Sequence, residues 1–269
     1  MKTNKIYHGD ALELLDKIPD ASIPLIISDG PYGVTSNEWD RFANLSTQEY
    51  NLMLIKIFNT KLMPGGVLYL FGKHDCIDFI DYSRYLTLQS RIIWYQPSSL
   101  AQGRKAYTDN HDMIAYFTKG KEARCFNLED IRIPQLVDVE QQKRVEASPS
   151  VSRGPYSKTA YNPSGKNPGN VWIDIKPLTY KSKELVSRET LNTIQKPEAL
   201  FERLILASSK KGDTVLDPFC GVGTCPAICK RYGRRYIAFE INKEYIKSAE
   251  LRLANTAGEQ LSLFEPTET

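Results

Sequence analysis

The fold is indicated by one stretch of the chain, residues 214–226, which reads TVLDPFCGVGTCP. The apolar residues before Asp217 are typical of a short buried strand, and Gly221 and Gly223 form a turn before a helical pattern that runs to Tyr232. A strand, a glycine turn and a helix in this order are typical of α/β folds, in which parallel strands alternate with helices.

A second apolar run, from Ile23 to Ser28, shows the same organisation. It is interpreted as a buried strand that ends at the tight turn Asp29-Gly30-Pro31. A helical pattern from Tyr50 to Phe58 and a strand from Val67 to Phe71 follow, so the order is strand, helix, strand. We therefore predict an α/β fold with a doubly wound, mostly parallel sheet. The remaining predicted elements are strands at 91–95, 113–118 and 236–240, and helices at 77–86, 197–208 and 243–254.

The periodicity weakens between residues 120 and 193, where turn-forming residues accumulate, and we interpret this region as an insertion into the α/β domain. Its basic residues alternate with aromatic ones, a mixture that suits contact with phosphates and stacking on bases. A solvated, loop-rich surface explains the same composition equally well. The residues concerned are Lys143, Arg144, Arg153, Tyr156, Lys158, Tyr161, Lys166, Trp172, Lys176, Tyr180 and Lys181.

The overall composition is that of a globular protein, with 269 residues, 41% of them hydrophobic and 25% charged. No apolar run is long enough to cross a bilayer and the first residues do not resemble a signal peptide, so we expect a cytoplasmic protein. A net charge of +3 does not by itself indicate a nucleic-acid partner. Five cysteines favour free thiols. Zinc binding by Cys225 and Cys229 is less well supported than burial in a helix, and no metal is expected.

The glycine turn at Gly221 and Gly223 predicts a cofactor that contains adenosine. Glycines let the backbone approach a ligand, and Glu240, about twenty residues further on, lies where an acid binds ribose hydroxyls. Two cofactor classes remain open. Asp217 stands before the turn, where a carboxylate suits the sulfonium and ammonium of S-adenosylmethionine better than the pyrophosphate of a dinucleotide. A turn with no ligand is the third alternative.

The turn after the first strand carries residues that suit the methylation of an exocyclic amine. The lone pair of such a nitrogen is delocalised into the ring, and acceptors that pull on its hydrogens favour the nucleophilic, pyramidal form. Asp29 and the carbonyl of Gly30 offer two acceptors, and Tyr32 could stack on a base that is flipped out of the duplex. Considered alone, the segment is better explained as an ordinary turn. Its occurrence together with the glycine turn favours catalysis.

Several motifs, in order, give the chain a resemblance to the amino-methyltransferases of DNA. It is similar to their beta class, in which the catalytic segment Asp29-Gly30-Pro31-Tyr32 precedes the cofactor loop, and the resemblance extends to about Asn255. The other matching motifs are Gly9-Asp10-Ala11-Leu12-Glu13, Pro64-Gly65-Gly66 with Leu70-Phe71-Gly72, Asn110-His111-Asp112, Gln195-Lys196-Pro197 and Phe219-Cys220-Gly221-Val222-Gly223.

The resemblance implies a Rossmann-like methyltransferase fold, S-adenosylmethionine as cofactor and a role for each motif. Residues 1–119 would form the catalytic half, 120–193 an inserted region that recognises the target, 194–255 the cofactor-binding half and 256–269 a flexible tail. It also implies double-stranded DNA as a partner, with a homodimer and a companion restriction endonuclease as further candidates. The expected cofactor-binding residues are Asp10, Asp29, Lys196, Asp217, Phe219, Gly221, Gly223, Thr224 and Glu240.

Gly30 departs from the family pattern, which usually has proline at this position. Glycine keeps the carbonyl that the role requires, but it is less rigid. The initial Asp29 resembles the adenine-specific members, so we predict methylation of adenine N6 at specific DNA sites. The alternatives are a cytosine-N4 methyltransferase, a DNA-binding relative with weakened activity, and a nicotinamide-dependent oxidoreductase.

Overall fold

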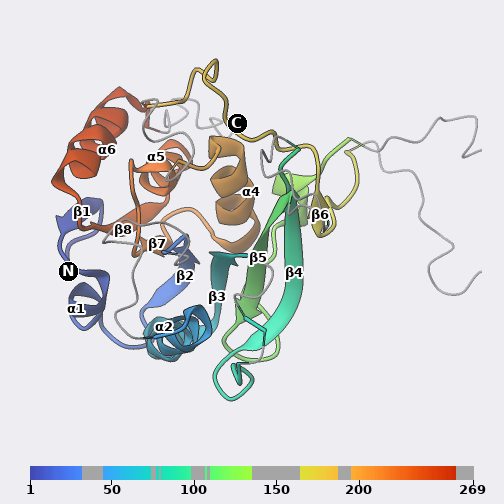
Figure 1. The fold of residues 1–269 in the computed structure, drawn as a ribbon, viewed down its shortest axis with the longest axis vertical. Coiled ribbons are helices and arrows are strands. Elements are labelled where there is room, and N and C mark those ends of the chain that lie inside the picture. Colours follow the sequence, from blue (N-terminus) through green and yellow to red (C-terminus); the bar gives the residue numbers. More distant parts are fainter. Residues whose placement is uncertain are drawn as a thin grey trace, which may run out of the picture.

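The computed structural model describes residues 1–31, 45–73, 77–78, 80–97, 107, 110–134, 164–186 and 195–258. These residues form one sheet of eight strands in the order β1-β8-β7-β2-β3-β5-β4-β6, shown in Figure 1. The strands are β1 (Lys5–His8), β2 (Ile23–Ser28), β3 (Leu62–Gly72), β4 (Thr87–Tyr95), β5 (His111–Thr118), β6 (Val171–Trp172), β7 (Thr214–Asp217) and β8 (Arg235–Glu240).

The sheet is mostly parallel, as predicted. β5 runs antiparallel to both of its neighbours, β3 and β4, and the other strand pairs are parallel. The described helices are α1 (Ala11–Leu15), α2 (Thr47–Lys61), the 3₁₀ helix η2 (Leu128–Ile131), α4 (Glu198–Ser208), α5 (Thr224–Arg231) and α6 (Lys243–Asn255). None of the helices in the described part of the chain is both long enough and apolar enough to span a membrane.

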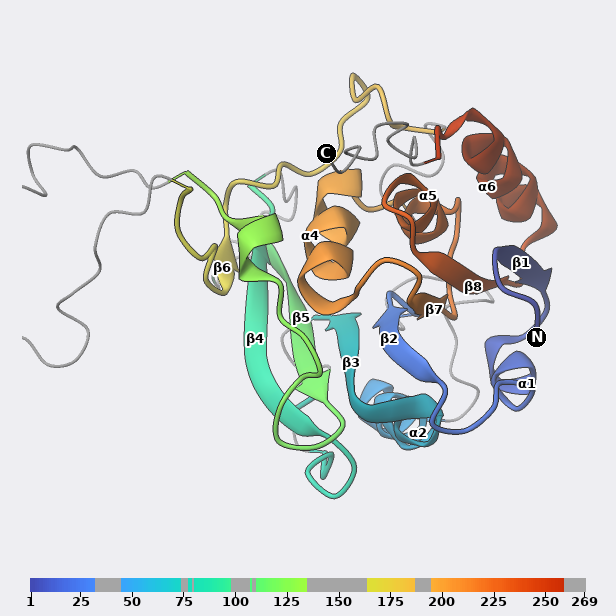
Figure 2. The same cartoon turned by 180° about the vertical axis from the view of Figure 1, so that it is seen from behind.

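Helices cover both faces of the sheet, as Figures 1 and 2 show from opposite sides. Along β2 the side chains alternate between the faces, because successive residues of a strand point in opposite directions. Leu25 and Ile27 pack with residues of α4 and α5, whereas Ile26 packs with residues of α1 and α2. Every residue of β2 is buried, which explains why it is an unbroken apolar run rather than an alternating one.

The predicted helix at 77–86 is wrong. Among its described residues the chain turns instead, and the N–H groups of Tyr85 and Leu86 both donate to the carbonyl of Tyr82. The local reason is Asp81, whose carboxylate accepts hydrogen bonds from the side chains of Ser83 and Arg84. Such short-range bonds favour a turn over a continuing helix.

Part of the predicted insertion is built into the sheet. β6 lies inside 120–193 and pairs with β4, and Trp172 in β6 is buried and donates its indole N–H to the carbonyl of Gly169. Ile133 and Lys166 form an antiparallel bridge at the two ends of the undescribed residues 135–163. β6 therefore joins part of the recognition region predicted for 120–193 to strand β4 of the sheet.

Candidate active site

The order of the strands reverses between β7 and β2, which are parallel neighbours in the sheet. From β7 the chain proceeds through α5 to β8 on one side, and from β2 through α2 to β3 on the other. In open α/β sheets, ligands bind at the carboxyl ends of the strands where the order reverses. The glycine turn follows β7 and Asp29 follows β2, so both predicted segments lie at this switch point.

Asp29 is held by Lys196, which is 167 residues away in the sequence. The Lys196 Nζ lies 3.1 Å from both carboxylate oxygens, and the two side chains are only 14% and 12% exposed. Burial alone would lower the pKa of Lys196, but the negative charges of Asp29 and Asp112 raise it. Lys196 therefore stays charged beside Asp29, although the sequence motif had assigned it to the cofactor.

Gly30 lies directly against the ring of Phe219 in the glycine turn. A Cβ atom at Gly30 would come within 2.9 Å of Cε2 and 3.0 Å of Cδ2 of that ring. Gly30 is not among the glycines with positive φ, so the ring, and not the backbone conformation, excludes a side chain. This contact joins the predicted catalytic segment to the predicted cofactor loop, and a side chain at position 30 would require the Phe219 ring to move.

Asp217 ends β7 and is 2% exposed. Its Oδ1 accepts the N–H of Phe219 at 3.1 Å. Burial raises the pKa of Asp217 to about 8, and the negative charges of Asp29 and Glu240 contribute, although the Phe219 N–H acts in the opposite direction. A cation bound beside Asp217 would favour its ionised form, so the carboxyl ends of β7 and β8 suit a positively charged ligand.

The glycine turn is shaped by Glu240 and by the approach of α6. Glu240 accepts the N–H of Gly221 at 2.9 Å and that of Asn242 at 2.8 Å. Gly223 has φ of +79°, and a Cβ there would lie 2.7 Å from the Cβ of Ala249 in α6. The turn therefore needs glycine at this position for its backbone conformation and for helix packing.

Asp10 lies at the same edge of the sheet. β1 pairs with β8 so that His8 is opposite Glu240, and the N–H of Gly9 donates to the carbonyl of Glu240. The Asp10 carboxylate caps α1 by accepting the N–H of Leu12 at 2.8 Å. Its predicted contact with the cofactor adenine stays a prediction, as does each cofactor role in the set. Tyr32, the predicted stacking residue, lies outside the described residues, and the predicted role of Pro31 stays a prediction.

The sequence reasoning missed the polar partners around Lys196. Asp112, which begins the buried part of β5, accepts hydrogen bonds from Lys73 Nζ at 2.6 Å and from Gln96 Nε2 at 2.5 Å. The motif Asn110-His111-Asp112 was a signal for this position, because it places an acid at the start of a predicted strand. No sequence motif indicated that Lys73 and Gln96 would contact Asp112.

The described cysteines do not form a metal site. Cys125, Cys220, Cys225 and Cys229 are free, and the last three are buried. Burial raises the pKa of Cys220 and of Cys225 well above the ordinary range. No group of three or more His, Cys, Asp or Glu among the described residues could hold a metal ion.

Comparisons with known proteins agree with this geometry. The family model N6_N4_Mtase, described as DNA methylase, matches residues 23–251. The Type II methyltransferase M.HpaI of Haemophilus parainfluenzae is 35% identical over 93% of this chain and 74% of its own length. The DNA adenine methyltransferase YhdJ of Escherichia coli (strain K12) is 35% identical over 92% of this chain and 82% of its own length. The chain therefore belongs to the N6/N4 family of DNA methyltransferases.

Solved structures show the same fold. PvuII DNA methyltransferase, described as cytosine-N4-specific, has a TM-score of 0.62 at 20% identity, covering 100% of this chain and 89% of that one. The M1.HpyAVI–SAM complex has a TM-score of 0.56 at 22% identity, covering 93% of this chain and 98% of that one. The Rossmann-like methyltransferase fold is thereby confirmed.

Proposed function

We propose that this chain transfers a methyl group from S-adenosylmethionine to the N6 amino group of an adenine flipped out of double-stranded DNA. One observation carries the proposal: the proposed catalytic segment and the glycine turn meet at the carboxyl ends of β2 and β7, where the Phe219 ring lies against Gly30. Family membership supports transfer to an amino group, N6 or N4. The initial Asp29 and the name of the E. coli relative support adenine.

The residues at the carboxyl ends of β7 and β8 fit the proposed cofactor. Asp217 and Glu240 place two carboxyl groups near the turn, and the sulfonium and ammonium of the cofactor would favour their ionised forms. Gly221 and Gly223 allow the backbone to approach the ligand closely. The proposed binding set is Asp10, Lys196, Asp217, Phe219, Gly221, Gly223, Thr224 and Glu240, with Asp29 at its border. The bound cofactor supplies an electrophilic methyl group.

Asp29 is the acceptor for the target amine in this proposal. A carboxylate has about four lone-pair positions, so it can bind Lys196 Nζ and still accept an N–H from the base. Lys196 keeps the carboxylate in one orientation, since it contacts both oxygens. The Gly30 carbonyl is the proposed second acceptor, and Tyr32 the stacking face. Methylation leaves the nitrogen with one excess proton, which Asp29 is placed to accept.

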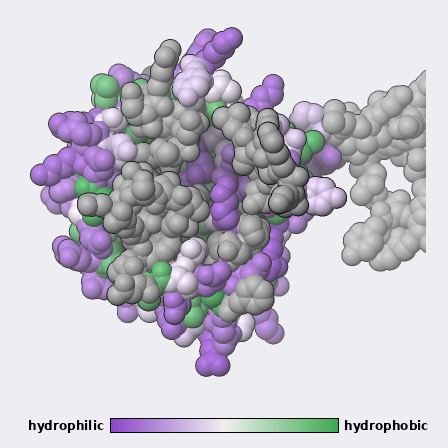
Figure 3. Space-filling model, viewed as in Figure 1, coloured by the Kyte–Doolittle hydropathy of each residue, from purple (hydrophilic) through white to green (hydrophobic). Residues whose placement is uncertain are grey.

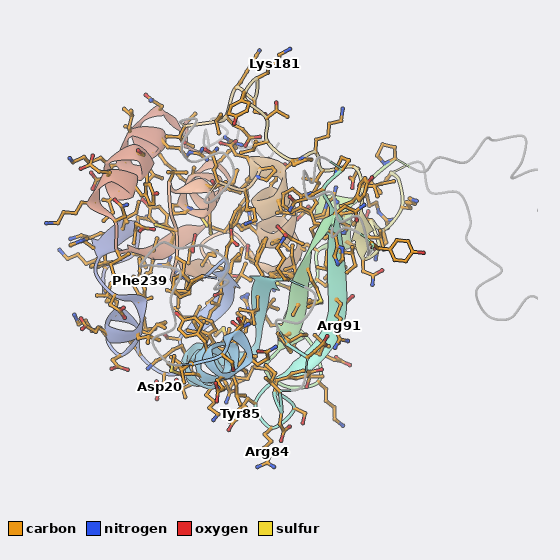
Figure 4. The ribbon with its side chains drawn as sticks, viewed as in Figure 1. Asp20, Arg84, Tyr85, Arg91, Lys181 and Phe239 are labelled. Atoms are coloured by element: carbon orange, nitrogen blue, oxygen red, sulfur yellow. The ribbon has the colours of Figure 1, made fainter. Side chains whose placement is uncertain are left out.

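The described part of the region 120–193 supports a DNA-binding role. Lys176, Lys181 and Lys183 lie on the strap between β6 and residue 186, and Tyr180 there is 63% exposed. Figure 4 shows Lys181 pointing outward at one end of the molecule, away from Arg84 at the other. On the face shown in Figure 3, most of the described residues that can be seen are hydrophilic. We propose that this strap contacts phosphates.

Product analysis tests the proposed reaction. The purified chain is incubated with labelled S-adenosylmethionine and DNA of mixed sequence, and the nucleosides are separated by mass spectrometry. N6-methyladenine is the expected product. N4-methylcytosine alone would refute the adenine assignment, and no labelled nucleoside on any sequence library would refute the reaction.

Two partner proposals are tested separately from the reaction. Sedimentation of the purified chain with and without DNA distinguishes a homodimer from a monomer. A companion restriction endonuclease, proposed because relatives are named Type II methyltransferases, would share the recognition sequence. The methylated site, once mapped, should therefore block cleavage by an endonuclease encoded beside this chain.

A further inference from the structure

Arg252, near the end of α6, connects three segments that lie far apart in the sequence. Its guanidinium donates to Thr224 Oγ1 at 3.1 Å and to the carbonyl of Glu184 at 2.9 Å, and it lies 3.6 Å from Glu198 Oε1. The side chain is only 8% exposed. A planar guanidinium can reach several acceptors in fixed directions, which the single ammonium of lysine cannot do.

Two of these contacts lead directly to the active site. Thr224 is the first residue of α5, follows Gly223 in the glycine turn and is buried. Glu198 is the first residue of α4, two positions after Lys196, which holds Asp29. Arg252 therefore contacts the cofactor loop and the segment that carries the partner of the catalytic acid.

The third contact leads to the proposed DNA-binding strap. The carboxylate of Glu184 accepts the N–H of Glu198 at 2.7 Å, where α4 has no side-chain cap from its own N-cap residue, Pro197. Gln195 donates to the Glu184 carbonyl at 2.6 Å and accepts the N–H of Val186 at 2.9 Å. The strap is thus bonded to both sides of Lys196.

The charges of this network balance one another. Glu184 and Glu198 contribute two carboxylates, and Arg231 and Arg252 contribute two guanidinium groups. Arg231 Nη2 lies 2.7 Å from Glu198 Oε2 on the more exposed side of the network, whereas the Arg252 side chain is buried. Removal of Arg252 would leave the buried Thr224 hydroxyl and the partly buried Glu184 carbonyl with one donor fewer each, which is more disruptive than the loss of a surface ion pair.

We propose that Arg252 is a positioning residue that fixes the glycine turn, the Lys196 segment and the DNA-binding strap relative to one another. This inference rests on the proposed function, because it assigns the three segments to cofactor, catalysis and DNA. Cofactor affinity and DNA affinity then depend on each other through this side chain. By thermodynamic linkage the dependence is equal in both directions.

The test uses Arg252→Gln, Arg252→Lys, Thr224→Val and the double variant Arg252→Gln/Thr224→Val, with Lys247→Ala as the matched control. Lys247 lies on the same helix, is 70% exposed and pairs with Glu244. Calorimetry gives the Kd of S-adenosylmethionine with and without DNA, and thermal unfolding gives the Tm of each variant. Steady-state kinetics separate KM from kcat.

We expect Arg252→Gln, Arg252→Lys and Thr224→Val each to raise the cofactor Kd and KM roughly tenfold, which is the effect of one lost charge-assisted hydrogen bond. Lys247→Ala should leave both constants unchanged. The double variant should lose no more than Arg252→Gln alone, because that substitution already removes the contact with Thr224. DNA should tighten cofactor binding in the wild type and in Lys247→Ala, and less so in Arg252→Gln and Arg252→Lys.

Additive losses in the double variant would overturn the inference, and so would a lowered Tm with unchanged Kd, KM and DNA effect. These results differ from a failure of the proposed function. In that case the wild type itself would neither bind S-adenosylmethionine nor methylate DNA.

Discussion

The contact between Gly30 and Phe219 predicts that a side chain at position 30 harms the enzyme. In Gly30→Ala the new Cβ would lie 2.9 Å from Phe219 Cε2. Carbon atoms in contact are ordinarily about 3.5 Å apart or more, so the ring would have to move by about 0.6 Å. Overpacking of this kind lowers the free energy of unfolding by about 1–3 kcal/mol. Gly30→Pro, which restores the usual family residue, should have the same effect or a larger one.

Urea unfolding and calorimetry with S-adenosylmethionine measure the two expected losses, in stability and in cofactor affinity. Gly258→Ala is the matched control, because a Cβ there meets only the end of the Lys230 side chain, at 4.0 Å. The double variant Gly30→Ala/Phe219→Leu should recover part of the lost stability. If Gly30→Ala unfolds and binds the cofactor as the wild type does, the ring is not what excludes a side chain, and the reasoning fails.

Three further predictions concern Asp29, Asp217 and Trp172. Asp29→Ala should abolish methyl transfer and leave the cofactor Kd within a fewfold of the wild type, measured by product formation and calorimetry; near-normal turnover would disprove the acceptor role. Between its ordinary value of 3.8 and a pKa of about 8, the Asp217 carboxyl holds its proton only in the folded chain, so the free energy of unfolding should fall as pH rises through this window. In the same window the ionised form attracts a cationic cofactor, so affinity should rise with pH, and Asp217→Asn should flatten both profiles. Trp172→Ala removes a buried indole and its hydrogen bond to Gly169, which should cost about 3–5 kcal/mol in urea unfolding and weaken DNA binding by gel shift; unchanged unfolding would show that β6 does not anchor the strap.

Where the sequence carried a strong local pattern, it predicted the fold closely. The apolar run from Ile23 to Ser28 is β2, and the run from Thr214 to Asp217 is β7, each with the predicted bounds. The short strand β1 was not predicted, because only Ile6 in it is buried and four residues give no periodicity. The stretch at 77–86 has apolar residues at helical spacing, but the side-chain bonds of Asp81 outweigh that pattern.

The candidate site was predictable as a set of segments but not as a set of contacts. Asp29 and the turn at Gly221 could be placed at one edge of the sheet, because strands of a doubly wound fold end there. The pairing of Asp29 with Lys196 depends on tertiary packing across 167 residues. Nothing in the residues around Arg252 distinguishes it from an ordinary charged helix residue, and only its burial and its three contacts do so.

The strand order has a consequence for how the chain is made. β2 pairs with β7 and β1 pairs with β8, so the first two strands to leave the ribosome can complete their pairing only after the last two have been synthesised. One edge of β2 exposes unsatisfied backbone groups until residue 217 has been synthesised, and β1 does so until residue 240, so both are sites for wrong pairing and aggregation. The two segments of the proposed site come together only when β7 pairs with β2. A nascent chain therefore cannot hold a working site before this part of the sheet has formed.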